Sequence, residues 1–506
     1  MSVRFLSRRA SITGPFAEIT VGSGSSAVVF NLPKELLCNS STYFKAALNN
    51  GFSETATQKI ALEDEDPEVF RTYAVYLFQH ELRRESIEAI NCIERHLFQV
   101  YIFADKRGIV SLANDVVTMI SSYWITECID LKITKKFLAL LPTKCTLYEL
   151  TLDNLILESR AHGWEPTDWE VFCSHPTEIV AELFRREQAF SKSFDRTSHC
   201  FESICHYHTH RGEDKNEEQE RTKCIEKTTR GRNLWDVYHC TYEQVEWGRR
   251  CHTSQYLWTG DFTDHLPSRS AITGPTAQII VGSKPNIKTF TVHKELLCDS
   301  STYFKAALNN GIVETKEQTI TLDDEDPNIF TTFVLWLYES KLNTDVIYMG
   351  HETFQGHLFN LYVFADKRGI VNLANDTTTM LASCWLSEFV ELSEVERVVP
   401  LISRSGKLYK LIMDNLLLEM RGGWGADDLK NIDLPKEMLI DLLSRITLSP
   451  AGFDTFNMCF QSICHYHFHG GQNVLSEEEC VRRVEAGNNV FDPEVDLRQK
   501  VWGWDD

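Results

Sequence analysis

An internal repeat limits what this chain can fold into more than any other feature of its sequence. The segment KELLCNSSTYFKAALNNG at 34–51 returns as KELLCDSSTYFKAALNNG at 294–311, with Asp299 in place of Asn39. Four further segments return in the same order, at offsets between 259 and 261 residues: DEDP (64–67 and 324–327), FADKRGIV (103–110 and 364–371), DNLILE (153–158, then DNLLLE at 414–419) and CFESICHYHTH (200–210, then CFQSICHYHFH at 459–469). A repeated unit of about 230 residues is a whole domain or more, because solenoid modules are roughly 20–50 residues long. We therefore expect two copies of one fold.

Composition excludes several classes of protein. The chain has 506 residues, of which 43% are hydrophobic and 24% are charged, as in an ordinary soluble globular protein. Its net charge of −21 disfavours binding to a nucleic-acid backbone, which needs clustered lysine and arginine. No apolar run approaches the length of a membrane span. Fifteen cysteines, an odd number without a secretion signal, indicate reduced thiols and predict the cytoplasm or the nucleus.

The first 110 or so residues of each copy show a mixed α+β pattern. Alternating apolar residues predict a strand over 17–22 that forms a hairpin with a second strand through Phe30 and Leu32. A third strand is expected over 58–62. Two short helices follow from the repeated segment 34–51, the second capped by Ser41 and ended by Gly51. We expect the same elements in the second copy.

Three local motifs allow a functional and a structural interpretation. The loop Gly22-Ser23-Gly24 lacks the lysine of a phosphate-binding loop and is predicted to be a hairpin turn. The acidic DEDP motif predicts a helix start, with Asp66 at the cap and Pro67 in the first turn. The DKRG motif at 105–108 and 366–369 is predicted to be a turn at a helix end, and an anion or partner contact remains an alternative.

The segments VHKELLCDSSTYFKAAL, DDEDPNIFTTFVLWLYES and LYVFADKRGIVNLAND of the second copy together resemble a BTB/POZ domain of the fungal type. Val292, His293 and Lys294 match the family pattern, whereas the first copy has Leu32 and Pro33 in place of the valine and histidine. The resemblance covers about 110 residues of each copy. It implies association with other proteins, and many members of the family are substrate adaptors of cullin-type ubiquitin ligases.

The repeat and the resemblance together predict a tandem organisation. Each BTB/POZ-like domain is expected to be followed by an α-helical extension that ends in a short tail rich in cysteine and histidine. The predicted boundaries are 10–125 for the first domain, 126–240 for its extension, 241–266 for a linker, 267–386 for the second domain and 387–506 for its extension.

The two tails carry a repeated pattern of metal-ligand type. It consists of Cys205, His208, His210 and Cys224 in the first copy, and of Cys464, His467, His469 and Cys480 in the second. Ligands three residues apart can meet one metal ion across a tight turn, and histidines two apart on extended backbone point to the same side. Two thiolates and two imidazoles complete a tetrahedral zinc site, so the pattern predicts about two structural zinc ions per chain.

Two alternatives to this ligand set stay open. The cysteines and histidines could be buried thiols and hydrogen-bonded imidazoles without a metal ion. The neighbouring Cys200 and His206, or Cys459 and His465 in the second copy, could also replace one of the ligands. The spacing is not that of a zinc finger that reads DNA.

We expect a non-enzymatic interaction protein, an adaptor, with no catalytic residue. Its expected partners are proteins bound through the BTB/POZ domains: a cullin, a second copy of the chain, or the other BTB/POZ domain of the same chain. A BTB-type transcriptional regulator is an alternative that the lack of a basic segment disfavours. A metal-dependent hydrolase is a weaker one, because it needs an open ligand position.

Overall fold

The structure of the chain is a computed structural model with two compact units, one built on Phe16–Thr263 and the other on Asp264–Asp506. The predicted linker 241–266 and Gly51 lie outside the residues that it describes. The described residues are 14–50, 53–84, 87, 89–143, 145–162, 171, 177–189, 207–209, 222, 271–309, 318–342, 344–347, 353–421, 436–448, 463–470, 474–485 and 489–491.

The first unit begins with a small three-stranded sheet of order β2-β1-β3. Strand β1 (Phe16–Val21) pairs antiparallel with β2 (Val28–Pro33) and parallel with β3 (Lys59–Leu62). Ile19 faces Phe30 on one side and Ile60 on the other, and all three are buried. The alternation read from the sequence therefore predicted the hairpin and the third strand correctly.

Helices cover the buried face of this sheet. Helix α3 starts as predicted, because the Ser41 hydroxyl accepts a hydrogen bond of 3.2 Å from Phe44 N. Helix α5 also starts as predicted, with Asp66 accepting from Glu68 N at 2.8 Å and Pro67 in its first turn. The helices of this part of the first unit are α2 (Lys34–Ser40), α3 (Thr42–Asn49), α4 (Ser53–Thr57), α5 (Pro67–Gln79), α6 (Ile93–Lys106), which ends in the DKRG motif, and α7 (Val110–Thr126), which follows it.

The DEDP and DKRG motifs are partners of each other. Arg107 donates to Glu65 at 2.7 Å, and its guanidinium lies 4.3 Å from the centre of the Tyr43 ring. Lys106 pairs with Asp64 at 2.6 Å. The Ser41 hydroxyl donates to the Arg107 carbonyl at 2.6 Å, so the turn also closes on the repeated segment. The basic charge of the motif is thus engaged inside the fold, which disfavours the alternative of an anion site.

The second unit has the same order of elements. Its sheet has the order β5-β4-β6, and Ile279 again faces Phe290 and Ile320. Between α16 and α18 lies the short helix α17, and the Thr353 hydroxyl caps α18 by accepting from Gly356 N. The elements are η5 (Ala271–Thr273), β4 (Thr276–Val281), β5 (Lys288–His293), α13 (Lys294–Ser300), α14 (Thr302–Asn309), β6 (Thr319–Leu322), α16 (Pro327–Glu339), α17 (Thr344–Ile347), α18 (Phe354–Lys367) and α19 (Val371–Cys384).

A cluster of aromatic rings forms the core beside each sheet. The Phe44 ring stacks on Tyr73 with ring centres 5.8 Å apart, and Phe304 stacks on Phe333 at 5.9 Å. Phe70 and Phe330 meet several rings edge to face in the two units. Such offset and edge contacts add to the free energy gained by burying large rings.

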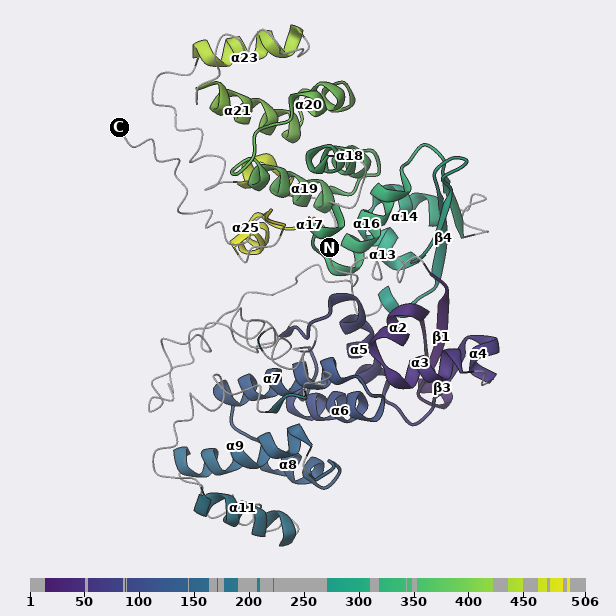
Figure 1. Cartoon of the computed structure of the whole chain (residues 1–506), viewed down its shortest axis with the longest axis vertical. Coiled ribbons are helices and arrows are strands. Elements are labelled where there is room, and N and C mark those ends of the chain that lie inside the picture. The colour runs from purple at the N-terminus through teal and green to yellow at the C-terminus, as the bar shows by residue number, and fades with distance from the viewer. Residues whose placement is uncertain are drawn as a thin grey trace. The chain divides into compact units, whose positions relative to one another are not determined.

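Further helices extend each unit away from its sheet in successive layers (Figure 1). In the first unit they are α8 (Leu131–Leu138), α9 (Thr146–His162) and α11 (Thr177–Ala189). In the second unit they are α20 (Leu392–Val398), η6 (Val399–Leu401), α21 (Lys407–Arg421) and α23 (Lys436–Leu448), followed by η7 (Ile463–Tyr466) and α25 (Glu477–Glu485). None of the helices described is both long and apolar enough to cross a lipid bilayer.

Candidate metal centre

Four side chains of the second unit converge at the end of its helical extension. Cys464, His467, His469 and Cys480 each offer one ligand atom, and these atoms all lie within 4.8 Å of one another. Cys464, His467 and Cys480 are buried, and His469 is partly exposed. The ligand set predicted for the second copy is therefore gathered at one place.

Local structure explains how distant residues reach this place. The 3-10 turn η7 brings Cys464 next to His467, whose amide donates to the Cys464 carbonyl at 3.1 Å. Helix α25 then supplies Cys480 from its first turn. Ser476 caps that helix by accepting from Glu479 N at 3.2 Å, and three glutamates in the first turn suit the positive end of the helix dipole.

Hydrogen bonds orient both imidazole rings. His467 Nε2 lies 3.1 Å from the Thr379 hydroxyl on α19, and its Nδ1 lies 3.0 Å from Cys480 Sγ. His469 Nδ1 lies 2.9 Å from the carbonyl oxygen of Leu475. The other ring nitrogen of His469, Nε2, is buried and has no hydrogen-bond partner. Each ring thus has one nitrogen held by the protein and one turned toward the cluster.

The two thiol groups of the cluster lie beside each other, and each changes the pKa of the other. A hydrogen bond from the Cys480 thiol lowers the pKa of Cys464. The same contact with an anionic sulfur raises the pKa of Cys480. A cluster that already stabilises one thiolate favours a positively charged ligand.

The alternative ligand His465 points elsewhere. Its Nε2 contacts Lys410 Nζ on α21, and its carbonyl accepts from Lys407 at 2.6 Å. Burial and these two lysines lower the pKa of the imidazole. His465 therefore does not replace a member of the cluster, and Cys459 lies outside the described residues.

Only one of the four predicted ligands of the first unit is described. His208 is buried and lies 3.0 Å from the Thr118 hydroxyl, as His467 lies beside Thr379. The Asn114 side chain accepts from the amide of the next residue, Thr209, at 2.9 Å and donates to its carbonyl at 3.0 Å. Asn375 makes the same two hydrogen bonds with Phe468. Cys200, Cys205, His206, His210 and Cys224 lie outside the described residues.

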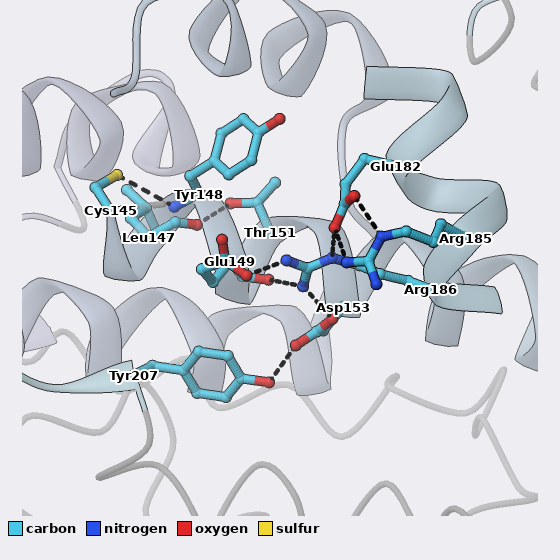
Figure 2. A network of polar contacts seen from close by, with 10 residues as sticks. All are labelled: Cys145, Leu147, Tyr148, Glu149, Thr151, Asp153, Glu182, Arg185, Arg186 and Tyr207. Carbon is cyan, nitrogen blue, oxygen red and sulfur yellow. Dashed lines mark hydrogen bonds and ion pairs between the residues drawn. The ribbon is translucent and has the colours of Figure 1, made fainter. Parts of the chain in front are cut away.

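A tyrosine anchors each tail to the helical extension. The Tyr207 hydroxyl donates to Asp153 on α9 at 2.7 Å, and Tyr466 donates to Asp414 on α21 at 2.8 Å. Figure 2 shows Arg186 of α11 reaching across to the same Asp153, and also to Glu149 and Glu182. The start of each tail is thus held in the same way in both units.

Sequence reasoning missed the helix on which the tail rests. Polar side chains of α19 at positions 372, 375, 376, 379 and 383 all bond to residues of the tail. Their spacing places them on one side of the helix. The sequence does carry a signal for this contact. Polar residues of LANDVVTMISS (112–122) recur at the same positions in LANDTTTMLAS (373–383), within a predicted helix that otherwise faces the core.

Comparison with known proteins supports the interpretation of the sheet-bearing part. The BTB/POZ domain family matches residues 276–370. A BTB/POZ domain-containing protein of Arabidopsis thaliana is 32% identical over 117 residues, which are 23% of this chain and 14% of that protein. Kelch-like protein 40b of Danio rerio is 34% identical over 56 residues, 11% of this chain and 9% of that protein. Residues 276–370 thus form a BTB/POZ domain, and the chain spans a small part of either relative.

Proposed function

We propose that this chain is a non-enzymatic adaptor that binds other proteins through BTB/POZ domains. The observation that carries the proposal is the match of the family to residues 276–370, together with the similarity to a Kelch-like protein. BTB/POZ domains are typically interaction modules, and the sequence resemblance implies association for this chain too. The cytoplasm or the nucleus is the proposed compartment.

We also propose that the first unit contains a second BTB/POZ domain. The order and pairing of its three strands, the caps of α3 and α5 and the pairing of Arg107 with Glu65 all recur in the second unit. The departures at Leu32 and Pro33 leave this framework in place. The proposed domains remain 10–125 and 267–386, each with a helical extension and a tail, joined by the linker 241–266.

The proposed partners follow from the family resemblance. A cullin-type ubiquitin ligase is the proposed external partner. The two BTB/POZ copies are proposed to pair within the chain, because a tether raises their effective concentration for each other. A homo-oligomer is the alternative arrangement.

Zinc is the proposed cofactor, at about two ions per chain, and its role is structural. Two thiolates and two imidazoles fill a tetrahedral site and leave no position for a substrate or a reactive water. The Cys/His tail is therefore proposed to stabilise the adaptor and not to hydrolyse a bond.

Titration of the full chain with isolated cullin N-terminal domains, followed by calorimetry and size-exclusion chromatography, tests the adaptor role. We expect a stable complex with at least one cullin. Phe70→Ala and Phe330→Ala each remove a fully buried ring from one copy, at a cost of about 3–5 kcal/mol, and so report which copy binds. Failure to bind any cullin would remove this partner from the proposal.

A further inference from the structure

We infer that Cys464 Sγ, His467 Nδ1, His469 Nε2 and Cys480 Sγ form a closed zinc site that fastens residues 474–485 and 489–491 onto the BTB/POZ domain. The inference rests on the proposed zinc cofactor and does not depend on the adaptor role. Each ligand then binds through one defined atom, and the bound zinc holds the tail in place.

The donor atom of His469 follows from its hydrogen bond. A carbonyl oxygen only accepts, so Nδ1 must carry the proton that it shares with Leu475 O at 2.9 Å. The neutral ring then has its lone pair on Nε2, which is buried without a hydrogen-bond partner. A buried polar atom without a partner is costly, and a metal ion at the cluster would satisfy it.

The donor atom of His467 follows from a chain of two hydrogen bonds. The Thr379 hydroxyl donates to the Asn375 carbonyl at 3.2 Å, so its oxygen is left to accept from His467 Nε2 at 3.1 Å. This fixes the proton on Nε2 and leaves the lone pair on Nδ1, which lies beside Cys480 Sγ. Metal-bound histidines commonly donate their second ring N–H in this manner.

The spread of the four atoms suits a tetrahedron. With Zn–S near 2.3 Å and Zn–N near 2.0 Å, ligand atoms of a tetrahedral zinc site stand roughly 3.3–3.8 Å apart. The four atoms of the cluster lie within 4.8 Å of one another, so small side-chain movements complete the site. Buried sulfur and imidazole donors favour zinc over calcium or magnesium, which prefer oxygen.

The segment that carries Cys480 also contacts the BTB/POZ domain. Arg483 donates to the Ser340 carbonyl at the end of α16, and Asn489 accepts from Leu342 N at 2.7 Å. The Phe491 ring lies 5.0 Å from the ring of Phe354, at the start of α18. These contacts join the last described residues of the chain to three positions within 276–370.

Helix α25 depends on contacts outside itself to stay folded. Helix α25 has nine residues, which is too short to be stable alone, and its sequence EEECVRRVE offers few apolar side chains. Cys480 is buried at the end of the first turn of this helix. A bond from zinc to this sulfur would therefore fix the helix, and with it the contacts of Arg483, Asn489 and Phe491.

Metal analysis of the full chain tests the site. We expect that Cys480→Ser lowers the bound zinc by one equivalent per chain, measured after gel filtration in the presence of zinc. His465→Ala is the matched control, because this histidine is next to Cys464 in the sequence but its side chain contacts Lys410 and lies outside the cluster. Cobalt added to the metal-free chain should give the absorption of a tetrahedral cobalt thiolate, and the cysteine variant should lose part of it.

Hydrogen exchange on the same proteins tests the fastening. In Cys480→Ser we expect exchange to be at least about tenfold faster in α25 and at Ser340, Leu342 and Phe354, which the tail contacts. Phe491→Ala should keep the zinc and lose protection only near Phe354. An unchanged zinc content in Cys480→Ser, or no cobalt thiolate absorption in the unmodified chain, would overturn the site. Zinc loss with unchanged exchange at Ser340, Leu342 and Phe354 would overturn the fastening. Cullin binding is a separate readout, so failure of the adaptor role is distinguishable from both.

Discussion

Glu94 in α6 is a buried carboxyl group at a position where the second copy has the amide of Gln355. Glu94 accepts from Trp124 Nε1 at 3.0 Å and from Asp130 N at 3.1 Å. Gln355 accepts from Trp385 Nε1 and Glu391 N at 2.8 Å and 3.0 Å. Burial raises the pKa of Glu94 to about 7, despite these donors. The same pair of donors, a tryptophan N–H and a backbone N–H, therefore binds an ionisable carboxyl group in the first unit and a neutral amide in the second.

The replacement Glu94→Gln should remove a pH-dependent loss of stability from the first unit. Because the folded pKa lies above the unfolded value, the carboxyl group favours folding at low pH, and this contribution is lost as the pH rises through 7. We expect Glu94→Gln to raise the free energy of unfolding at pH 8 by on the order of 2–3 kcal/mol, with little change at pH 5. Thermal unfolding of the full chain between pH 5 and pH 8.5 measures this.

The reverse change, Gln355→Glu, is the matched control in the second unit. It should introduce the same loss of stability above neutral pH. If Glu94→Gln changed the free energy of unfolding equally at pH 5 and pH 8, the change would come from altered packing and not from removal of the ionisable group.

At the scale of elements, the junction between DEDP and DKRG holds three segments together. Arg107 bonds to Glu65 ahead of α5, stacks on Tyr43 of α3 and sits at the end of α6. The Arg107 and Glu65 side chains are only 8% and 11% exposed. Removal of either partner would therefore leave the other charge buried where water cannot easily solvate it. Arg368 makes the equivalent contacts to Glu325 and Tyr303.

Replacing Arg107 by lysine should destabilise the first unit although it keeps the charge. A lysine has no flat guanidinium group to stack on the tyrosine ring. We expect a loss of about 2–4 kcal/mol in denaturant unfolding, toward the cost of breaking a buried ion pair. Arg368→Lys should produce a similar loss in the second unit, whereas no loss in either variant would contradict the proposed structural role of the DKRG motif.

Elements that depend on local sequence could be predicted, whereas the surroundings of the site could not. Strand alternation and the caps Ser41 and Asp66 are set by near neighbours, and the structure confirms them. The convergence of Cys464, His467 and His469 could be predicted from a C-x-x-H-x-H spacing that recurs in both copies, and that of Cys480 from a second cysteine that follows this motif in each copy. The roles of Thr379 and Leu475 O could not, because they depend on which side of α19 meets the tail and on how the chain turns after His469.

At the scale of the whole molecule, duplication has left two units that share a framework and differ in detail. The sheets, caps, aromatic clusters and tail anchors correspond, whereas Glu149 of the first unit bonds to Arg186 and its counterpart Lys410 contacts His465. This difference lies in the helical extensions. We propose that the BTB/POZ copies provide association and that the extensions provide what distinguishes one partner from another.

Native mass spectrometry of the full chain over a dilution series most directly tests whether this is a tandem interaction protein with structural zinc. A single spectrum reports both the number of chains and the number of bound metal ions. We predict one chain with two zinc ions at every concentration, as the proposed pairing of the two copies on one tether and the proposed zinc sites require. A metal-free species of two or more chains that dissociates on dilution would contradict both the pairing within the chain and the zinc sites.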